Sequence, residues 1–319
     1  MNSDWVAATV RSRSMARRRA GSGLIDRVAR SGSLSAGLDL LRETGYGPRL
    51  ASADTLLAAQ RATRDSVLWE VRVLAGWVPP GGTALLRAVA AAYEADNIIQ
   101  LARRLAQGSA PSPAPMSRTG TDGRGEAAPF ELGSLATAWP RISVADSPAE
   151  LADLLRRSPW GDPGPDLPAV LTAVRLRRLA AAAPEAADST ARAAALLAAR
   201  VRLVGGTPPA ARLVSLLRPL LGVGWTEARS LAELRAALPA RLQPLLADLS
   251  TPADLWRAES TLPVLEEAKG FRLLRSGVPG PEVVFGAVEV LTADAWRLRA
   301  ALAAAAGETG SSEVLNAVA

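Results

Sequence analysis

The stretch that decides the fold runs from Thr83 to Gly108 and reads TALLRAVAAAYEADNIIQLARRLAQG. The Pro-Pro-Gly-Gly turn at 79–82 cannot continue a helix, and Thr83 is a natural N-cap residue directly after it. Gly108 suits a left-handed C-terminal cap. Apolar residues recur at helical spacing between these two ends, so the stretch predicts one long amphipathic helix.

A polar pair, Asp96-Asn97, interrupts the apolar stripe of this helix. Asp and Asn are poor residues inside helices because their side chains compete for nearby backbone groups. On a buried stripe they need hydrogen-bond partners, which predicts a polar clasp that fixes a neighbouring helix or loop, with Asn97 making a buried hydrogen bond. The alternative is that the pair lies at the edge of the stripe and is solvated, and the sequence leaves both interpretations open.

Outward from this stretch, the chain reads as a series of helical hairpins. The first pairs the long helix with a preceding helix that ends near residue 75, for which Ser52 and Asp54 are candidate N-caps. Two more hairpins are expected near 166–206 and 262–306. No segment shows the sustained alternation of a strand, so the predicted fold class is all-α.

Helix starts and a low-complexity segment suggest how the chain is divided. Ser147 and Ser230 each begin a capping-box pattern with a glutamate three residues later. Residues 109–129 are rich in Gly, Ser and Pro and predict a flexible linker, and the tail from Gly307 is expected to be frayed. The expected domains are three similar helical-hairpin units, at 1–108, 130–221 and 222–319.

Composition excludes several kinds of chemistry. The 319 residues are 49% hydrophobic, which allows a large core, and they contain neither cysteine nor histidine. Disulfides, thiolate metal sites and the usual near-neutral general base are therefore excluded. The single lysine, Lys269, and the pair Glu266-Glu267 are interpreted as solvated helix residues. There is no phosphate-binding GxxxxGK[ST] loop, and we predict no catalytic residue, cofactor site or metal site.

The net charge of +6 and the pI of about 10.8 raise the question of nucleic acid as a partner. However, the arginines are spread along nearly every expected helix and alternate with acids, so no nucleic-acid partner is expected. No apolar run is long enough for a transmembrane helix. The arginine-rich first thirty residues are not followed by a long apolar segment, so a secretory signal is not expected.

Three stretches carry a family resemblance. LRETGYGPRL at 41–50 is similar to the L-x-x-T-x-Y-G turn of the C-type central-stalk family of the V/A-type (vacuolar/archaeal-type) ATPases, whose eukaryotic member is of d type. YEADNIIQLAR at 93–103 resembles that family's D-x-x-N-[LI]-x-x-L-x-R helix with a shortened acid–asparagine spacing, and DAWRLR at 294–299 resembles its closing E-x-x-x-L-R helix. The middle of the chain matches mainly in layout, since Arg192-Ala193-Ala194-Ala195 replaces the expected acid–asparagine pair.

Structural roles are implied by these matches for Tyr46, Asp96, Asn97, Arg297 and Arg299. The ring of Tyr46 is expected to pack against helices, with its hydroxyl reaching a partner. The resemblance also implies a funnel of three helical domains whose central cavity receives the tip of a rotary axle. Such a protein is a non-catalytic central-stalk (rotor) part, present once per complex, that couples the D- and F-type axle subunits to the membrane proteolipid ring during ATP-driven pumping or ion-driven ATP synthesis.

The implied location is cytoplasmic, on the inner face of the plasma membrane and peripheral to it through the ring. The alternative interpretation is an arginine-rich all-α regulatory or nucleic-acid-binding protein.

Overall fold

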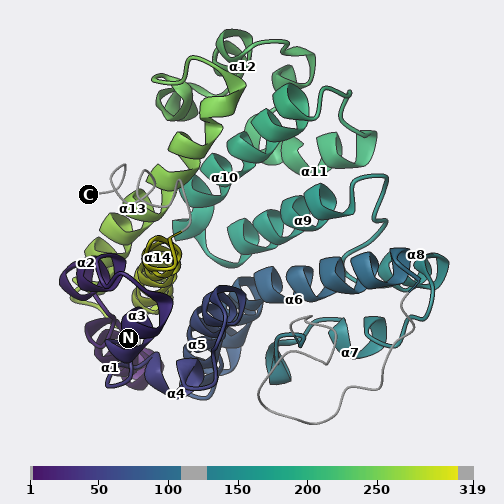
Figure 1. The fold of residues 1–319 in the computed structure, drawn as a ribbon. Coiled ribbons are helices and arrows are strands. Elements are labelled where there is room, and N and C mark those ends of the chain that lie inside the picture. The colour runs from purple at the N-terminus through teal and green to yellow at the C-terminus, as the bar shows by residue number, and fades with distance from the viewer. Residues whose placement is uncertain (1–2, 109–127, 308–319) are drawn as a thin grey trace. The chain divides into compact units, whose positions relative to one another are not determined.

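The computed structural model describes residues 3–108 and 128–307, which form helices and no strand (Figure 1). The all-α prediction is therefore confirmed for this part of the chain. Most of the predicted linker, at 109–127, and the tail at 308–319 lie outside the described residues. Among the helices described, none is both long and apolar enough to cross a membrane.

The chain divides into two compact units, and neither is continuous in sequence. The described residues of unit 1 are 3–86, 128–133 and 263–307, and those of unit 2 are 87–108 and 134–262. The division falls inside the long helices α6 (Thr83–Ala106) and α13 (Leu255–Leu274). The expected arrangement of three domains in a funnel stays a prediction.

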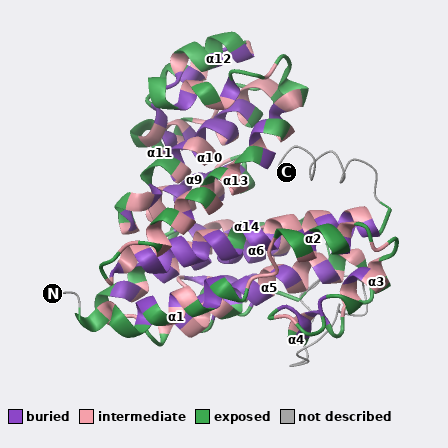
Figure 2. Cartoon of the chain, turned by 90° about the vertical axis from the view of Figure 1, so that its left-hand side faces the viewer, coloured by how far each residue is buried: buried purple, intermediate pink, exposed green. Residues whose placement is uncertain are grey.

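Unit 1 is built around α14 (Pro281–Ala305), whose residues are buried on nearly every side (Figure 2). A helix that is apolar all round belongs inside a core. The helices packed against α14 are α1 (Val6–Arg17), α2 (Ser22–Ala29), α3 (Leu34–Asp39) and α5 (Leu56–Ala75). The short α4 (Gly47–Leu50) packs on α5.

Two glycines let α13 approach α14 closely. A Cβ on Gly270 would lie 2.7 Å from the carbonyl oxygen of Gly286, and a Cβ on Gly286 would lie 2.7 Å from the Cβ of Leu273. Both distances are too short for real side chains, so only glycine permits this packing. The close contact lies near the turn that joins the two helices, as expected for the hairpin predicted near 262–306.

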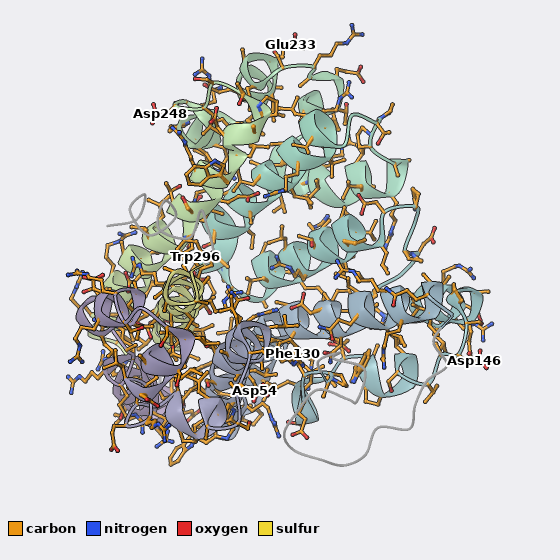
Figure 3. All side chains as sticks on the ribbon, in the orientation of Figure 1. Asp54, Phe130, Asp146, Glu233, Asp248 and Trp296 are labelled. Atoms are coloured by element: carbon orange, nitrogen blue, oxygen red, sulfur yellow. The ribbon has the colours of Figure 1, made fainter. Side chains whose placement is uncertain are left out.

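Residues 128–133 belong to unit 1 because they are anchored on α5. The buried ring of Phe130 (Figure 3) lies 3.6 Å from the guanidinium of Arg61 and 5.0 Å from that of Arg64, both on α5. Glu131 forms an ion pair with Arg72 of the same helix at 3.5 Å. Cation–π contacts and this pair thus fix the segment to its own unit.

Unit 2 has two apolar clusters. The first packs α6 against α7 (Trp139–Ile142), α8 (Pro148–Arg156) and α9 (Leu167–Ala182) around the fully buried Trp160. The second surrounds the fully buried Trp225 and is formed by α9, α10 (Ala187–Ala199), α11 (Ala211–Leu221), α12 (Leu231–Ala237) and part of α13. A π-helical segment, Arg200–Val204, extends α10.

Several helix ends follow the predictions. Gly108 has a φ of 70°, which confirms the left-handed cap after α6. The Ser147 and Ser230 hydroxyls accept the backbone N–H of Glu150 and Glu233, as capping residues do.

Two cap predictions were wrong. The Thr83 hydroxyl donates to the carbonyl of Pro80 at 3.1 Å instead of accepting an N–H, because a 3₁₀ turn at Pro80–Gly82 leads directly into α6. The N-cap of α5 is Thr55 rather than Ser52 or Asp54, and its hydroxyl accepts the N–H of Ala58. The backbone conformation decides which residue caps a helix. When several polar residues are adjacent, the sequence alone does not show which of them has that conformation.

Candidate functional site

In unit 1, the turn that carries Tyr46 is held by its own side chains. The Thr44 hydroxyl donates to the Leu41 carbonyl at 2.7 Å and accepts the Tyr46 N–H at 3.2 Å. A Cβ on Gly47 would lie 2.0 Å from the carbonyl oxygen of Arg42, so this position accepts only glycine. The Thr-x-Tyr-Gly spacing is thus explained by one turn that closes on itself and presents the tyrosine.

Tyr46 is joined to the far end of the sequence by Asp294 of α14. The Tyr46 hydroxyl donates to the Asp294 carboxyl group at 2.8 Å, and the backbone N–H groups of Ala20 and Gly21 donate to it at 2.9 and 2.8 Å. Gly21 is the N-cap residue of α2 and has a φ of 73°. Asp294 is only 1% exposed, so it links three segments from inside the core of unit 1.

Burial dominates the electrostatics of Asp294. Desolvation raises the pKa of its carboxyl group above the ordinary value, although the hydrogen bonds from Gly21, Ala20 and Tyr46 and the nearby charge of Arg19 act in the opposite direction. The charged form of a buried carboxyl group loses its hydration, and these donors replace only part of it. The aspartate therefore stabilises the unit through the donors it satisfies and at some cost in desolvation.

Farther along α14, Arg297 pairs with Glu267 of α13 at 2.5 Å, and both side chains are largely buried. Lys269 pairs with Glu266 at 2.8 Å, again with little exposure, and its ammonium group lies 4.9 Å from the ring of Phe285. The interpretation of Lys269, Glu266 and Glu267 as solvated residues was wrong. The close approach of α13 and α14 covers them, which apolar periodicity alone does not show.

Arg299 lies on α14 two residues beyond Arg297 and is partly exposed. The structure therefore brings Tyr46, Arg297 and Arg299 into unit 1, on or against one helix. Asp96 and Asn97 belong to unit 2.

In unit 2 the buried acid of α6 is Glu94, which is 0% exposed. Its carboxyl group accepts the backbone N–H groups of Ala138 and Trp139 at 2.6 Å each and that of Thr137 at 3.1 Å. These three residues lead into the short helix α7. Glu94 thus supplies the acceptor that the start of α7 lacks within its own chain segment.

Arg178 of α9 completes this contact. Its guanidinium donates to the Thr137 hydroxyl at 2.6 Å and lies 5.3 Å from the ring of Trp160. Burial lowers the pKa of Arg178, while the nearby Glu94 acts to raise it. An arginine in this position remains charged and offsets the acid.

Of the polar pair predicted to form a clasp on α6, the structure shows the burial of one member. Asn97 is 1% exposed, so it is buried and the solvated alternative is wrong for it, whereas Asp96 is partly exposed. The side chain that accepts hydrogen bonds from the neighbouring loop is Glu94, one turn earlier. The predicted hydrogen bond of Asn97 stays a prediction.

Glu94 and Asp294 both lie within the stretches of family resemblance, but neither is among the site residues predicted from the sequence. A signal for Glu94 is present, because it continues the buried row that contains Ala91, Ile98 and Leu101. An acid in such a row requires donors from another segment. No comparable signal identifies the donors, which come from irregular backbone.

The hydrogen-bond donors described above contact both oxygens of each carboxyl group. Within the part of the chain that the structure describes, no three potential ligand side chains gather into a metal-binding group. The chemistry of both sites is the fixing of backbone segments.

A scan against models of known protein families finds no match for this chain, and a search of curated proteins finds none either.

Proposed function

We propose that this chain is a non-catalytic central-stalk component of a V/A-type rotary ATPase, similar to the C-type or d-type members of that family. The proposal rests on the resemblance of 41–50, 93–103 and 294–299 to the family. One observation links the first and the last of these stretches structurally. The buried hydrogen bond of 2.8 Å between Tyr46 and Asp294 joins them across most of the sequence.

The physical properties of the two units suit a part that transmits force. Long helices with buried polar anchors resist local deformation, because an anchor that moves leaves buried donors unsatisfied. Unit 1 has such an anchor at Asp294, and unit 2 has one at Glu94. The proposed partners are the D- and F-type axle subunits and the proteolipid ring, and the proposed location is the cytoplasmic face of the membrane that holds the ring.

The decisive experiment is affinity purification of the tagged full-length chain from mildly solubilised native membranes, followed by mass spectrometry. We expect axle, proteolipid and catalytic-head subunits in fixed ratios at moderate salt. A cell line that expresses the same tag on an unrelated soluble protein is the control. Recovery of nucleic acid that disappears steeply as salt rises, with no ATPase subunit present, would contradict the proposal and favour the arginine-rich binding alternative.

A second readout tests function rather than association. Membrane vesicles from cells that lack the chain should lose ATP-driven ion uptake while detached catalytic heads still hydrolyse ATP, because the coupling part is missing. Expression of the wild-type chain should restore uptake. Unchanged uptake in the deletion strain would overturn the proposed coupling role.

A further inference from the structure

Unit 2 carries an open surface hollow of about 450 Å³, lined by residues of the π-helical segment, of α11 and of the segment 223–227 that follows α11. Neither buried carboxyl group described above takes part in it. Its lining combines apolar side chains with two arginines and one glutamate, and it includes Pro208, Val214, Val223, Arg202, Arg218 and Glu227. A mixture of apolar surface and a few polar groups is typical of a binding site.

Within the described residues, neither arginine of the hollow forms a direct ion pair. Arg202 Nε is buried and has no hydrogen-bond partner among the described residues. Arg200, two positions earlier in the same π-helical segment, is by contrast held by both carboxyl oxygens of Glu259. Arg218 is exposed on α11 and forms no ion pair within the described chain. An unpaired, partly desolvated guanidinium group favours an anionic ligand.

The local backbone supports a role in binding. π-helical turns are rare and occur frequently at functional sites, because the extra residue per turn displaces a side chain from the regular helical position. Here the π-helical segment contains Arg202. The same segment ends at Val204, which is 60% exposed, and Val223 in the lining is 49% exposed. These valines offer apolar surface next to the cations.

The ligand chemistry follows from the balance of these groups. Two guanidinium groups suit a carboxylate, while Glu227 in the same lining disfavours a ligand with a second negative charge. The apolar surface at Val204 lies on the segment adjoining the hollow and favours a ligand longer than a small anion. We infer that this hollow binds an acidic–apolar peptide segment of a partner protein, with its carboxylate at Arg202 and Arg218 and its aliphatic side chain against Val223.

The test uses the full-length chain and a defined probe with one carboxylate, the fluorescein-labelled and C-terminally amidated peptide Ser-Leu-Gln-Val-Leu-Glu-Ser, in fluorescence anisotropy titrations. A matched peptide with Gln in place of the single Glu isolates the charge. We expect it to bind about tenfold more weakly, as the loss of one charge-assisted contact predicts. No binding of the acidic peptide, or equal binding of the two peptides, would overturn the inference.

Variants locate the site. Arg202→Gln and Arg218→Gln should each weaken binding of the acidic peptide about fivefold, and Val223→Ser should weaken both peptides, by roughly the amounts that single interface contacts contribute. Arg141→Gln is the matched control, because Arg141 is exposed on α7 and does not line the hollow. Thermal melting must show that all variants remain folded. A loss as large in Arg141→Gln would indicate net charge alone and contradict the site.

Competition separates the peptide from a simple anion. Inorganic phosphate should displace the peptide no better than sodium chloride of equal ionic strength. Stronger displacement by phosphate would assign the hollow to a free oxyanion and overturn the peptide inference. The inference does not depend on the proposed rotor function. A negative result in the peptide-binding test would therefore not contradict the rotor function, and a negative result for the rotor function would not contradict peptide binding.

Discussion

Unit 1 and unit 2 each contain a buried acid that accepts backbone N–H groups, but the sequence separation between the acid and its donors differs. In each, a buried acid on a long helix accepts backbone N–H groups from the segment that starts a shorter helix, Asp294 for α2 and Glu94 for α7. Asp294 holds residues 273 and 274 positions away, whereas Glu94 holds residues 43 to 45 positions away. The contact in unit 1 therefore joins residues 20 and 21 to α14 near the other end of the sequence. The contact in unit 2 joins α6 to the start of the next α-helix, α7.

The two contacts also differ in their donors. Glu94 accepts three backbone N–H groups, two of them at 2.6 Å, and Asp294 accepts two such groups and the Tyr46 hydroxyl. Backbone donors cannot turn away when the acceptor is lost, whereas a tyrosine hydroxyl can rotate. The shorter-range contact should therefore be the more costly one to remove.

The largest effect is expected for Glu94→Ala. It leaves the N–H groups of residues 137–139, one buried and two partly buried, without their acceptor, which should lower the free energy of unfolding of unit 2 by about 3–5 kcal/mol. Urea unfolding measures the loss, and hydrogen exchange of those amides should accelerate. Asp248→Ala is the matched control, since Asp248 is an exposed acid of the same unit (Figure 3). Equal effects of the two substitutions would refute the proposed role of Glu94.

Asp294→Ala should cost less, about 2–3 kcal/mol, and should act on unit 1. It removes the acceptor of Ala20, Gly21 and Tyr46, but it also removes a carboxyl group whose charged form burial disfavours. Hydrogen exchange at residues 20 and 21 is the direct readout, with the exposed Asp54 replaced by alanine as control (Figure 3). A larger loss than for Glu94→Ala would reverse the comparison between the two units.

Helices are predictable from this sequence because periodicity and capping are local. The left-handed cap at Gly108 and the caps at Ser147 and Ser230 all depend on residues within a few positions of one another. The expectation that the Tyr46 hydroxyl reaches a partner is confirmed as well. Asp294 could not be named as that partner, because no local pattern connects positions 248 residues apart.

The polar sites are predicted less well for a related reason. Asp96-Asn97 stands out as an interruption of the stripe. Glu94 stands out less, because glutamate is an ordinary helix residue and its only signal is its place in the row of Ala91, Ile98 and Leu101. Lys269 looks solvated in the sequence for the same reason, and the α13–α14 contact covers it. Whether a charge is buried depends on how closely two helices approach, here through Gly270 and Gly286.

Asn97→Leu tests the part of the clasp that stays predicted. If the buried amide is hydrogen-bonded, the substitution leaves its partners unsatisfied and should lower the stability of unit 2 by about 1–2 kcal/mol. Thermal unfolding measures the change, and Asn97→Asp distinguishes the loss of the amide from a change of shape. A higher melting temperature for Asn97→Leu, without loss of assembly, would show that Asn97 is no clasp.

Tyr46→Phe should have a smaller effect, about 1 kcal/mol on unit 1, because it deletes one hydrogen bond and keeps the buried ring. The effect should shrink when Asp294 is already alanine, since the two side chains share one contact. A double-mutant cycle measured by urea unfolding checks this coupling. Additive effects would mean that the hydrogen bond contributes nothing to stability.

The smallest expected effect is at Glu70 of α5. Unlike Asp294 and Glu94, it has a buried carboxyl oxygen that accepts no hydrogen bond within the described part of the chain. Burial raises the pKa of Glu70, although Arg18, Arg11 and Arg49 act in the opposite direction, and one of its carboxyl oxygens is buried without a hydrogen bond among the described residues. An acid with a raised folded-state pKa contributes its full stability below its ordinary pKa. That contribution is lost as the pH rises through the raised value.

Glu70→Gln should therefore stabilise unit 1 slightly at neutral pH and leave it unchanged in acid, where the wild-type side chain is already neutral. Water screens the half-buried group, so the gain should stay within about 0.5 kcal/mol. Unfolding curves across the pH range measure it. A gain that persists in acid would point to packing rather than charge, and a loss at neutral pH would show that the three arginines outweigh desolvation. The latter result would make Glu70 a third anchor, with side-chain cations in place of backbone donors.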